Sequence, residues 1–107
     1  MVGASWEGFA LEEVVSRLDA RPEECFFWAT HQGAELDLLV VRGARRIGFE
    51  FKRTTAPSVT RSMRTAQEDL RLSDLYVVHA GTRSGNLAAG IRSVAFSRLL
   101  DDLEPLR

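Results

Sequence analysis

The spacing of apolar residues predicts a helix over residues 5–19. Ser5 stands where it can cap the first turn, and no proline interrupts the segment before Pro22. One arc of the helical wheel is apolar, formed by Leu11, Val14, Val15 and Leu18. Glu7 falls in the middle of this arc, where a buried carboxylate is costly unless it is paired or binds a cation. Glu7 is therefore a candidate site residue; the alternative is that it faces solvent and interacts with the positive helix terminus.

Two segments after this helix, residues 34–41 and 46–52, alternate apolar and polar side chains as half-buried strands do. The short loop 42–45 contains a glycine suited to a hairpin turn, so we expect the two strands to pair. If Val41 pairs with Arg46, one face of the hairpin is entirely apolar. That face consists of Leu36, Leu38, Val40, Ile47, Phe49 and Phe51.

The same register gathers four charged residues at one end of the other face. Asp37 then lies opposite Glu50, and Glu35 lies opposite Lys52. Opposed carboxylates on neighbouring strands have Cβ atoms roughly 5 Å apart and repel each other. A hard divalent cation bound by oxygen ligands would compensate that repulsion, so we interpret the pair as a metal site. The alternative is a solvated hairpin face with a Glu35–Lys52 salt bridge.

Lys52 is the only lysine among fourteen basic residues. It follows Glu50 by two positions, so the two side chains point to the same side of a strand. An ammonium group is a compact donor whose pKa can be shifted, which a guanidinium is not. A lysine beside two carboxylates indicates metal-assisted phosphodiester hydrolysis; the alternative is that its presence here is chance.

The rest of the chain predicts an α/β architecture. Residues 58–71 have an apolar stripe at helical spacing, formed by Val59, Met63, Ala66 and Leu70. The nearly continuous apolar run 75–80 is typical of a buried parallel strand, and His79 at its end is expected to be a capping or core-edge residue. After a connection that includes a helical turn at 87–89, a short strand at 94–96 and a helix at 97–103 complete the domain. The core order αβββαβ predicts a mixed sheet with helices on both faces.

Length and composition narrow the function classes. One hundred and seven residues suffice for a single domain, residues 1–107. The sequence contains no phosphate-binding loop of the G-x-x-x-x-G-K-[ST] type, and this absence excludes nucleotide hydrolysis by this segment. A net charge of −1 argues against a strongly non-specific nucleic-acid binder. The lone Cys25 fits a reducing cytoplasm, the N-terminus does not read as a signal peptide, and no apolar run approaches the ~20 residues that span a membrane.

Several motifs together resemble a known family. They are Gly3-Ala4-Ser5-Trp6-Glu7-Gly8-Phe9, Phe27-Trp28-Ala29-Thr30, Gly33-Ala34-Glu35-Leu36-Asp37-Leu38 and Phe49-Glu50-Phe51-Lys52-Arg53. The set is similar to a domain of unknown function that forms the C-terminal part of prokaryotic AAA-type ATPases. That domain resembles a diverged PD-(D/E)XK nuclease with a restriction-endonuclease-like fold. Two departures are Ala29, where related chains often carry arginine, and the lack of an ATPase.

The resemblance implies a role for each matched residue. Asp37, Glu50 and Lys52 occupy the nuclease motif, and Glu7 matches the first-helix glutamate. Mg²⁺, with Mn²⁺ able to substitute, would be ligated by Asp37, Glu50 and the carbonyl of Phe51, while Glu7 would hold a second ion or a metal-bound water. Glu35 would support the site, and Lys52 would orient the attacking water.

The expected substrate is nucleic acid, with DNA favoured over RNA. Gln67 and Arg64 on the helix 58–71, and Arg53 after the catalytic strand, are candidates to approach its phosphates. The alternative for this helix is a solvated amphipathic face. The alternative for the whole domain is a catalytically weak or inactive nuclease-fold module that docks a protein partner or regulates an AAA-type ATPase.

Overall fold

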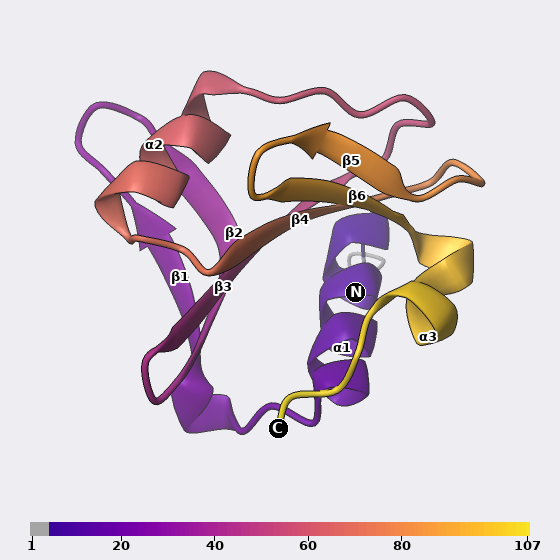
Figure 1. Ribbon diagram of the computed structural model, residues 1–107, viewed down its shortest axis with the longest axis horizontal. Coiled ribbons are helices and arrows are strands. Elements are labelled where there is room, and N and C mark those ends of the chain that lie inside the picture. Colours follow the sequence, from indigo (N-terminus) through magenta and orange to yellow (C-terminus); the bar gives the residue numbers. More distant parts are fainter. Residues whose placement is uncertain (1–4) are drawn as a thin grey trace.

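The chain folds around a six-stranded mixed sheet with helices on both faces (Figure 1). The computed structural model describes residues 5–107, so Gly3 and Ala4 of the first motif lie outside the described residues. In chain order the elements are α1 (Trp6–Leu18), η1 (Pro22–Glu24), β1 (Cys25–Ala29), β2 (Glu35–Arg42), β3 (Arg45–Lys52), α2 (Arg61–Asp69), β4 (Asp74–His79), β5 (Gly85–Ala88), β6 (Ile91–Ala95), η2 (Phe96–Arg98) and α3 (Leu99–Asp102). The predicted order αβββαβ is observed up to β4, and the strand order across the sheet is β1-β2-β3-β4-β6-β5.

Helix α1 forms where the sequence predicted it. The Ser5 hydroxyl accepts a hydrogen bond from the Gly8 N–H at 3.0 Å, and Asp19 ends the helix in the left-handed conformation with φ of 57°. The buried stripe consists of Ala10, Val14 and Leu18 and packs on one face of the sheet. Glu7 is exposed in the first turn, so the expectation that it sits on a buried stripe is wrong.

The hairpin register is the one predicted, because Val41 pairs with Arg46 and Leu38 with Phe49. On the face toward α1, both strands contribute to one apolar core. This core also takes in β4, β6 and the C-terminal turns, and its buried members are Ala10, Val14, Leu18, Leu38, Val40, Ile47, Phe49, Phe51, Val78, Val94, Leu99 and Leu103.

A β-bulge changes the predicted face of one residue. Along β1 and β2, Phe26 registers with Leu39 and Trp28 with Leu36, so Phe27 opposes two residues, Asp37 and Leu38. The extra residue reverses the alternation, and Leu36 packs in the core on the other face of the sheet. Its expected place beside Leu38 was therefore wrong, because the hairpin pattern alone carries no sign of the bulge.

The second core lies between the sheet and α2, on the face opposite α1 (Figure 1). Thr60 caps α2, since its hydroxyl accepts a hydrogen bond from the Met63 N–H at 3.2 Å. The helix connects two parallel strands, β3 and β4, and β6 is also parallel to β4. The buried members of this core are Leu36, Leu39, Met63, Ala66, Leu75, Val77 and Ile91.

The segment after β4 differs from the sequence prediction. Residues 85–88 form the edge strand β5, which pairs antiparallel with β6, so the helical turn expected at 87–89 is wrong. Leucine and alanine favour helix locally, but pairing with β6 satisfies the backbone of this segment instead. The strand expected at 94–96 begins earlier, at Ile91.

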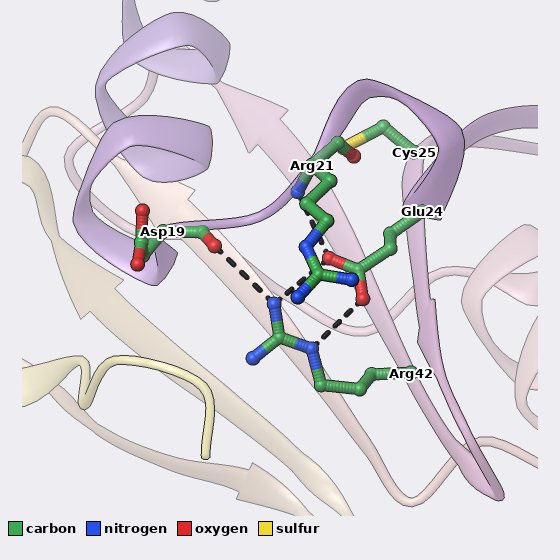
Figure 2. Close-up of polar contacts among 5 residues, drawn as sticks. All are labelled: Asp19, Arg21, Glu24, Cys25 and Arg42. Carbon is green, nitrogen blue, oxygen red and sulfur yellow. Dashed lines mark hydrogen bonds and ion pairs between the residues drawn. The ribbon is translucent and has the colours of Figure 1, made fainter.

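An ion pair fixes the far end of the hairpin to the turn before β1 (Figure 2). Arg42 donates to both carboxylate oxygens of Glu24, at 2.8 and 2.9 Å, and the Arg21 N–H donates to the same carboxylate at 2.9 Å. The Arg42 hydrogen bonds, followed by the Arg21 amide, lower the pKa of Glu24 to about 2. Arg42 also donates to the Asp19 carbonyl, which places the C-terminal end of α1 at this end of the sheet. Within residues 5–107, no helix has the length and apolar character needed to cross a membrane.

Candidate functional site

Asp37 and Glu50 meet where the β2–β3 ladder ends. The last ladder pair is Leu38 with Phe49, and beyond it each carboxylate binds the backbone of the other strand. The Asp37 N–H donates to Glu50 Oε2 at 2.8 Å, and the Phe51 N–H donates to Asp37 Oδ2 at 2.9 Å. The bulge positions Asp37 for this exchange, because it turns the strand out of regular pairing at that residue. The two acids are thus held by backbone amides rather than by rotamer preference alone.

Glu50 is a buried acid in an unfavourable position for a charge. Only 7% of its side chain is exposed, and burial followed by repulsion from Asp37 raises the pKa of its carboxyl. Lys52 partly offsets this, with its Nζ 3.6 Å from Glu50 Oε1. The Lys52 side chain is 45% exposed, so water screens much of that attraction. An additional positive charge at this site would stabilise the ionised pair.

The hydrogen-bond pattern leaves one oxygen of each carboxylate without a backbone donor. The backbone amides occupy Glu50 Oε2 and Asp37 Oδ2, so Asp37 Oδ1 and Glu50 Oε1, the latter 3.6 Å from Lys52 Nζ, remain as candidate ligands. The N–H and C=O of one strand residue point to the same side, and the Phe51 N–H points toward β2. The Phe51 carbonyl therefore faces the same region beyond the end of the ladder. Three oxygen donors from three residues suit a hard cation that keeps several waters.

Glu7 and Glu35 do not complete a larger acidic cluster. The first turn of α1 lies at the end of the sheet where β3 ends, but α1 covers the face opposite Glu50. Glu35 is exposed at the start of β2, and the ion pair of Lys52 is with Glu50, not with Glu35. Within the described chain, no three acidic, histidine or cysteine side chains are close enough to hold one ion together. The acidic pair is consequently Asp37 and Glu50.

The residues predicted to contact nucleic acid lie in different settings. Arg53 follows β3 directly and is exposed, and Arg64 is exposed on α2. Gln67 instead donates its side-chain amide to the Ala89 carbonyl at 2.8 Å. It thereby connects α2 to the turn between β5 and β6, which is a structural role. A hollow of about 480 Å³ lies between the β1–β2 turn and α2, with Arg61 in its wall.

His79 lies beside Lys52 in a way that the sequence did not reveal. Its Cα registers with that of Lys52 on the neighbouring parallel strand. The residue is 2% exposed, as its expected core-edge role requires, and Nδ1 accepts a hydrogen bond from the Gly81 N–H at 3.0 Å. Nε2 is buried and has no partner within residues 5–107, and burial lowers the pKa of the ring. Only the parallel register, which depends on the crossover through α2, brings it beside Lys52.

Comparisons with known proteins match the chain to a domain of unknown function and to uncharacterised relatives. Residues 2–99 match the family model described as a domain of unknown function, DUF4143. The chain is 43% identical over 99 residues to an uncharacterised protein of Mycobacterium bovis and, equally, to one of Mycobacterium tuberculosis. These matches cover 92% of the chain and 22% of each relative, so the chain spans about a fifth of the length of these proteins. No solved structure matches.

Proposed function

We propose that this chain, which belongs to the DUF4143 family, is a metal-dependent phosphodiester hydrolase acting on nucleic acid, with DNA favoured. The observation that supports the proposal is the Asp37–Glu50 pair, held by reciprocal backbone hydrogen bonds beside the only lysine. Nothing in fold stability calls for two carboxylates there, since burial already raises the pKa of Glu50. The mixed sheet with helices on both faces is compatible with a restriction-endonuclease-like fold, which we include in the proposal.

Each residue of the pair has a defined part in this mechanism. Asp37 Oδ1, Glu50 Oε1 and the Phe51 carbonyl would hold Mg²⁺ or Mn²⁺. The bound ion would supply a polarised phosphate oxygen and an activated water. Lys52, which projects from the same face as Glu50, would orient that water by hydrogen bonding and stabilise the negative charge that develops on phosphorus-bound oxygen. Arg53 and Arg64 would position neighbouring phosphates.

A second candidate is a docking or regulatory module with the same fold and little catalysis. The absence of a third ligating acid among residues 5–107 and the net charge of −1 favour it, because neither suits a strong nucleic-acid enzyme. In either case we propose a cytoplasmic setting and an AAA-type ATPase, as a further region or a separate partner. The two candidates differ in what metal and lysine substitutions do.

Metal binding is tested by thermal unfolding with Asp37→Asn. Mg²⁺ or Mn²⁺ should raise the Tm of the parent, because an ion at a hundredfold excess over its Kd stabilises the folded state by about 2.7 kcal/mol. Asp37→Asn should abolish the metal-induced shift, while Asp69→Asn, on the end of α2, should leave it intact. A variant whose metal response equals that of the parent would show that Asp37 does not ligate the ion.

Catalysis is tested by conservative exchange of single basic residues on β3. Lys52→Arg keeps the charge but replaces a point donor with a planar fork, and should reduce cleavage of DNA about 10²-fold. Arg45→Lys, at the exposed start of the same strand and far from the pair, is the control and should have a small effect. Single-stranded, double-stranded and branched DNA should each be tried with Mn²⁺, with and without an ATPase partner. If the parent cleaves none of them, the docking module is the better account.

A further inference from the structure

The two edges of the sheet are protected to different degrees. At one edge, β5 has four residues, a register shift and a glycine at its start. At the other edge, β1 reads Cys-Phe-Phe-Trp-Ala and contains neither a charged residue nor a proline. Phe26 is 50% exposed and Phe27 66% exposed. Edge strands are usually protected by charges, prolines or short length, because an open apolar edge is a template for another strand.

The two phenylalanines project from opposite faces of the sheet. Phe26 registers with Leu39, which packs in the core beneath α2. Cys25 registers with Val40, which packs in the core beneath α1, so Phe27 lies on that side by alternation. A partner that covered one face of the sheet would leave one phenylalanine exposed. A strand added to the edge covers both.

The backbone of β1 also has groups available for pairing. The Thr30 N–H donates to the Ala34 carbonyl at 2.8 Å, so Thr30 points toward β2. Backbone groups alternate along a strand, and the extra residue of the bulge lies on β2 rather than β1. The N–H and C=O of Phe27 and Ala29 therefore point away from β2, to the open edge.

We propose that this edge is the interface with a second copy of the chain, whose β1 pairs antiparallel across a twofold axis at Phe27. In this register Phe27 opposes its own symmetry mate, Phe26 opposes Trp28, and Cys25 opposes Ala29. Every opposed pair is apolar, and the aromatic pairs occur on both faces. A register centred on Phe26 would instead bring Glu24 against Trp28 and disturb the ion pair with Arg42.

The symmetry has a consequence for the acidic pairs. An axis perpendicular to the sheet joins the two sheets edge to edge, with α1 of both copies on one side and α2 of both on the other. The two Asp37–Glu50 pairs then lie on either side of the axis, each separated from it by its own β1, because Phe27 on the axis is level with Asp37. This arrangement does not depend on whether the pairs hydrolyse phosphodiesters.

Sedimentation velocity or light scattering over a concentration series tests the interface. The parent should approach twice its 12.0 kDa chain mass as concentration rises. Phe27→Pro should remain at 12.0 kDa with an unchanged circular dichroism spectrum, because the N–H it removes points to the open edge. The control Leu100→Arg changes a residue on α3 that is 70% exposed, and should still dimerise.

If Phe27→Pro does not fold, Phe27→Lys serves in its place, since a charge at an edge strand prevents pairing while leaving β1–β2 intact. A parent that remains at the mass of one chain up to high micromolar concentration would overturn the proposal. So would a folded Phe27→Pro or Phe27→Lys variant that dimerises like the parent.

Discussion

Glu50→Gln should make the metal-free protein more stable at pH 8. The substitution keeps the shape of the side chain and an oxygen that accepts from the Asp37 N–H, but it removes the buried charge. Two charges ~5 Å apart at an effective dielectric of ~20 repel by about 3 kcal/mol. Removing the charge also relieves the desolvation cost of Glu50, which is the larger of the two causes that raise the pKa of its carboxyl.

Two losses reduce the gain. The hydrogen bond from Asp37 changes from charge-assisted to neutral, which costs about 1 kcal/mol. The contact with Lys52 is lost, but at 3.6 Å and with the lysine 45% exposed it contributes only about 0.5 kcal/mol. With solvent screening of the half-buried Asp37, we expect a net gain of about 1 kcal/mol, or ~5 °C in Tm for a domain of this size.

The pH dependence provides the sharper test. Because the pKa of Glu50 is raised in the folded state, the folded protein holds this proton more tightly than the unfolded chain. Its contribution is therefore most favourable below the unfolded value of 4.5, and is lost as pH rises through the folded pKa. Parent and Glu50→Gln should have equal free energies of unfolding in acid and diverge as pH rises.

Urea unfolding from pH 4 to pH 8 measures this difference, with Glu35→Gln as the control on an exposed residue of β2. The control should differ little from the parent at every pH. If Glu50→Gln is less stable than the parent at pH 8, or if the difference is the same at all pH values, burial and repulsion from Asp37 do not raise the pKa of Glu50.

Two further predictions concern the scaffold. Arg42→Gln should lower the free energy of unfolding at pH 7, because it removes the ion pair with Glu24. The depressed pKa of Glu24 stabilises the parent above pH 4.5, and this contribution is lost as pH falls toward the folded value of about 2, so the variant should lose less stability on acidification than the parent. Urea unfolding measures both effects, and the control Arg98→Gln, which breaks an exposed ion pair with Asp102, should have a much smaller effect. Gly48→Ala should destabilise by about 1–3 kcal/mol in the same assay, because the added Cβ would lie 2.8 Å from Leu72 Cδ1 and 3.0 Å from Leu36 Cδ2, and the buried Leu36 has little space to move. A variant as stable as the parent would contradict the close packing of Leu36 and Leu72 on Gly48.

Local pattern was sufficient for the elements and for one register. Ser5 and the apolar spacing predicted α1, and the alternation of β2 and β3 with a short turn predicted the pairing of Val41 with Arg46. These features depend on neighbours within a few positions, so the sequence carries them directly. The proximity of Asp37 to Glu50 follows from the same register. Whether they bind a cation stays a prediction.

Tertiary structure decided the rest, because it depends on segments distant in the chain. The bulge that moves Leu36 to the α2 side arises in the pairing of β2 with β1, which the β2–β3 hairpin pattern does not contain. A helical turn was predicted at 87–89, where Leu87, Ala88 and Ala89 favour helix, yet Leu87 and Ala88 belong to strand β5 because β6 inserts beside β4 and offers it a partner. His79 lies beside Lys52 only because the crossover through α2 sets the parallel register. Period and propensity describe one segment at a time, whereas strand order and register across a crossover are set by which segments bury each other's surface.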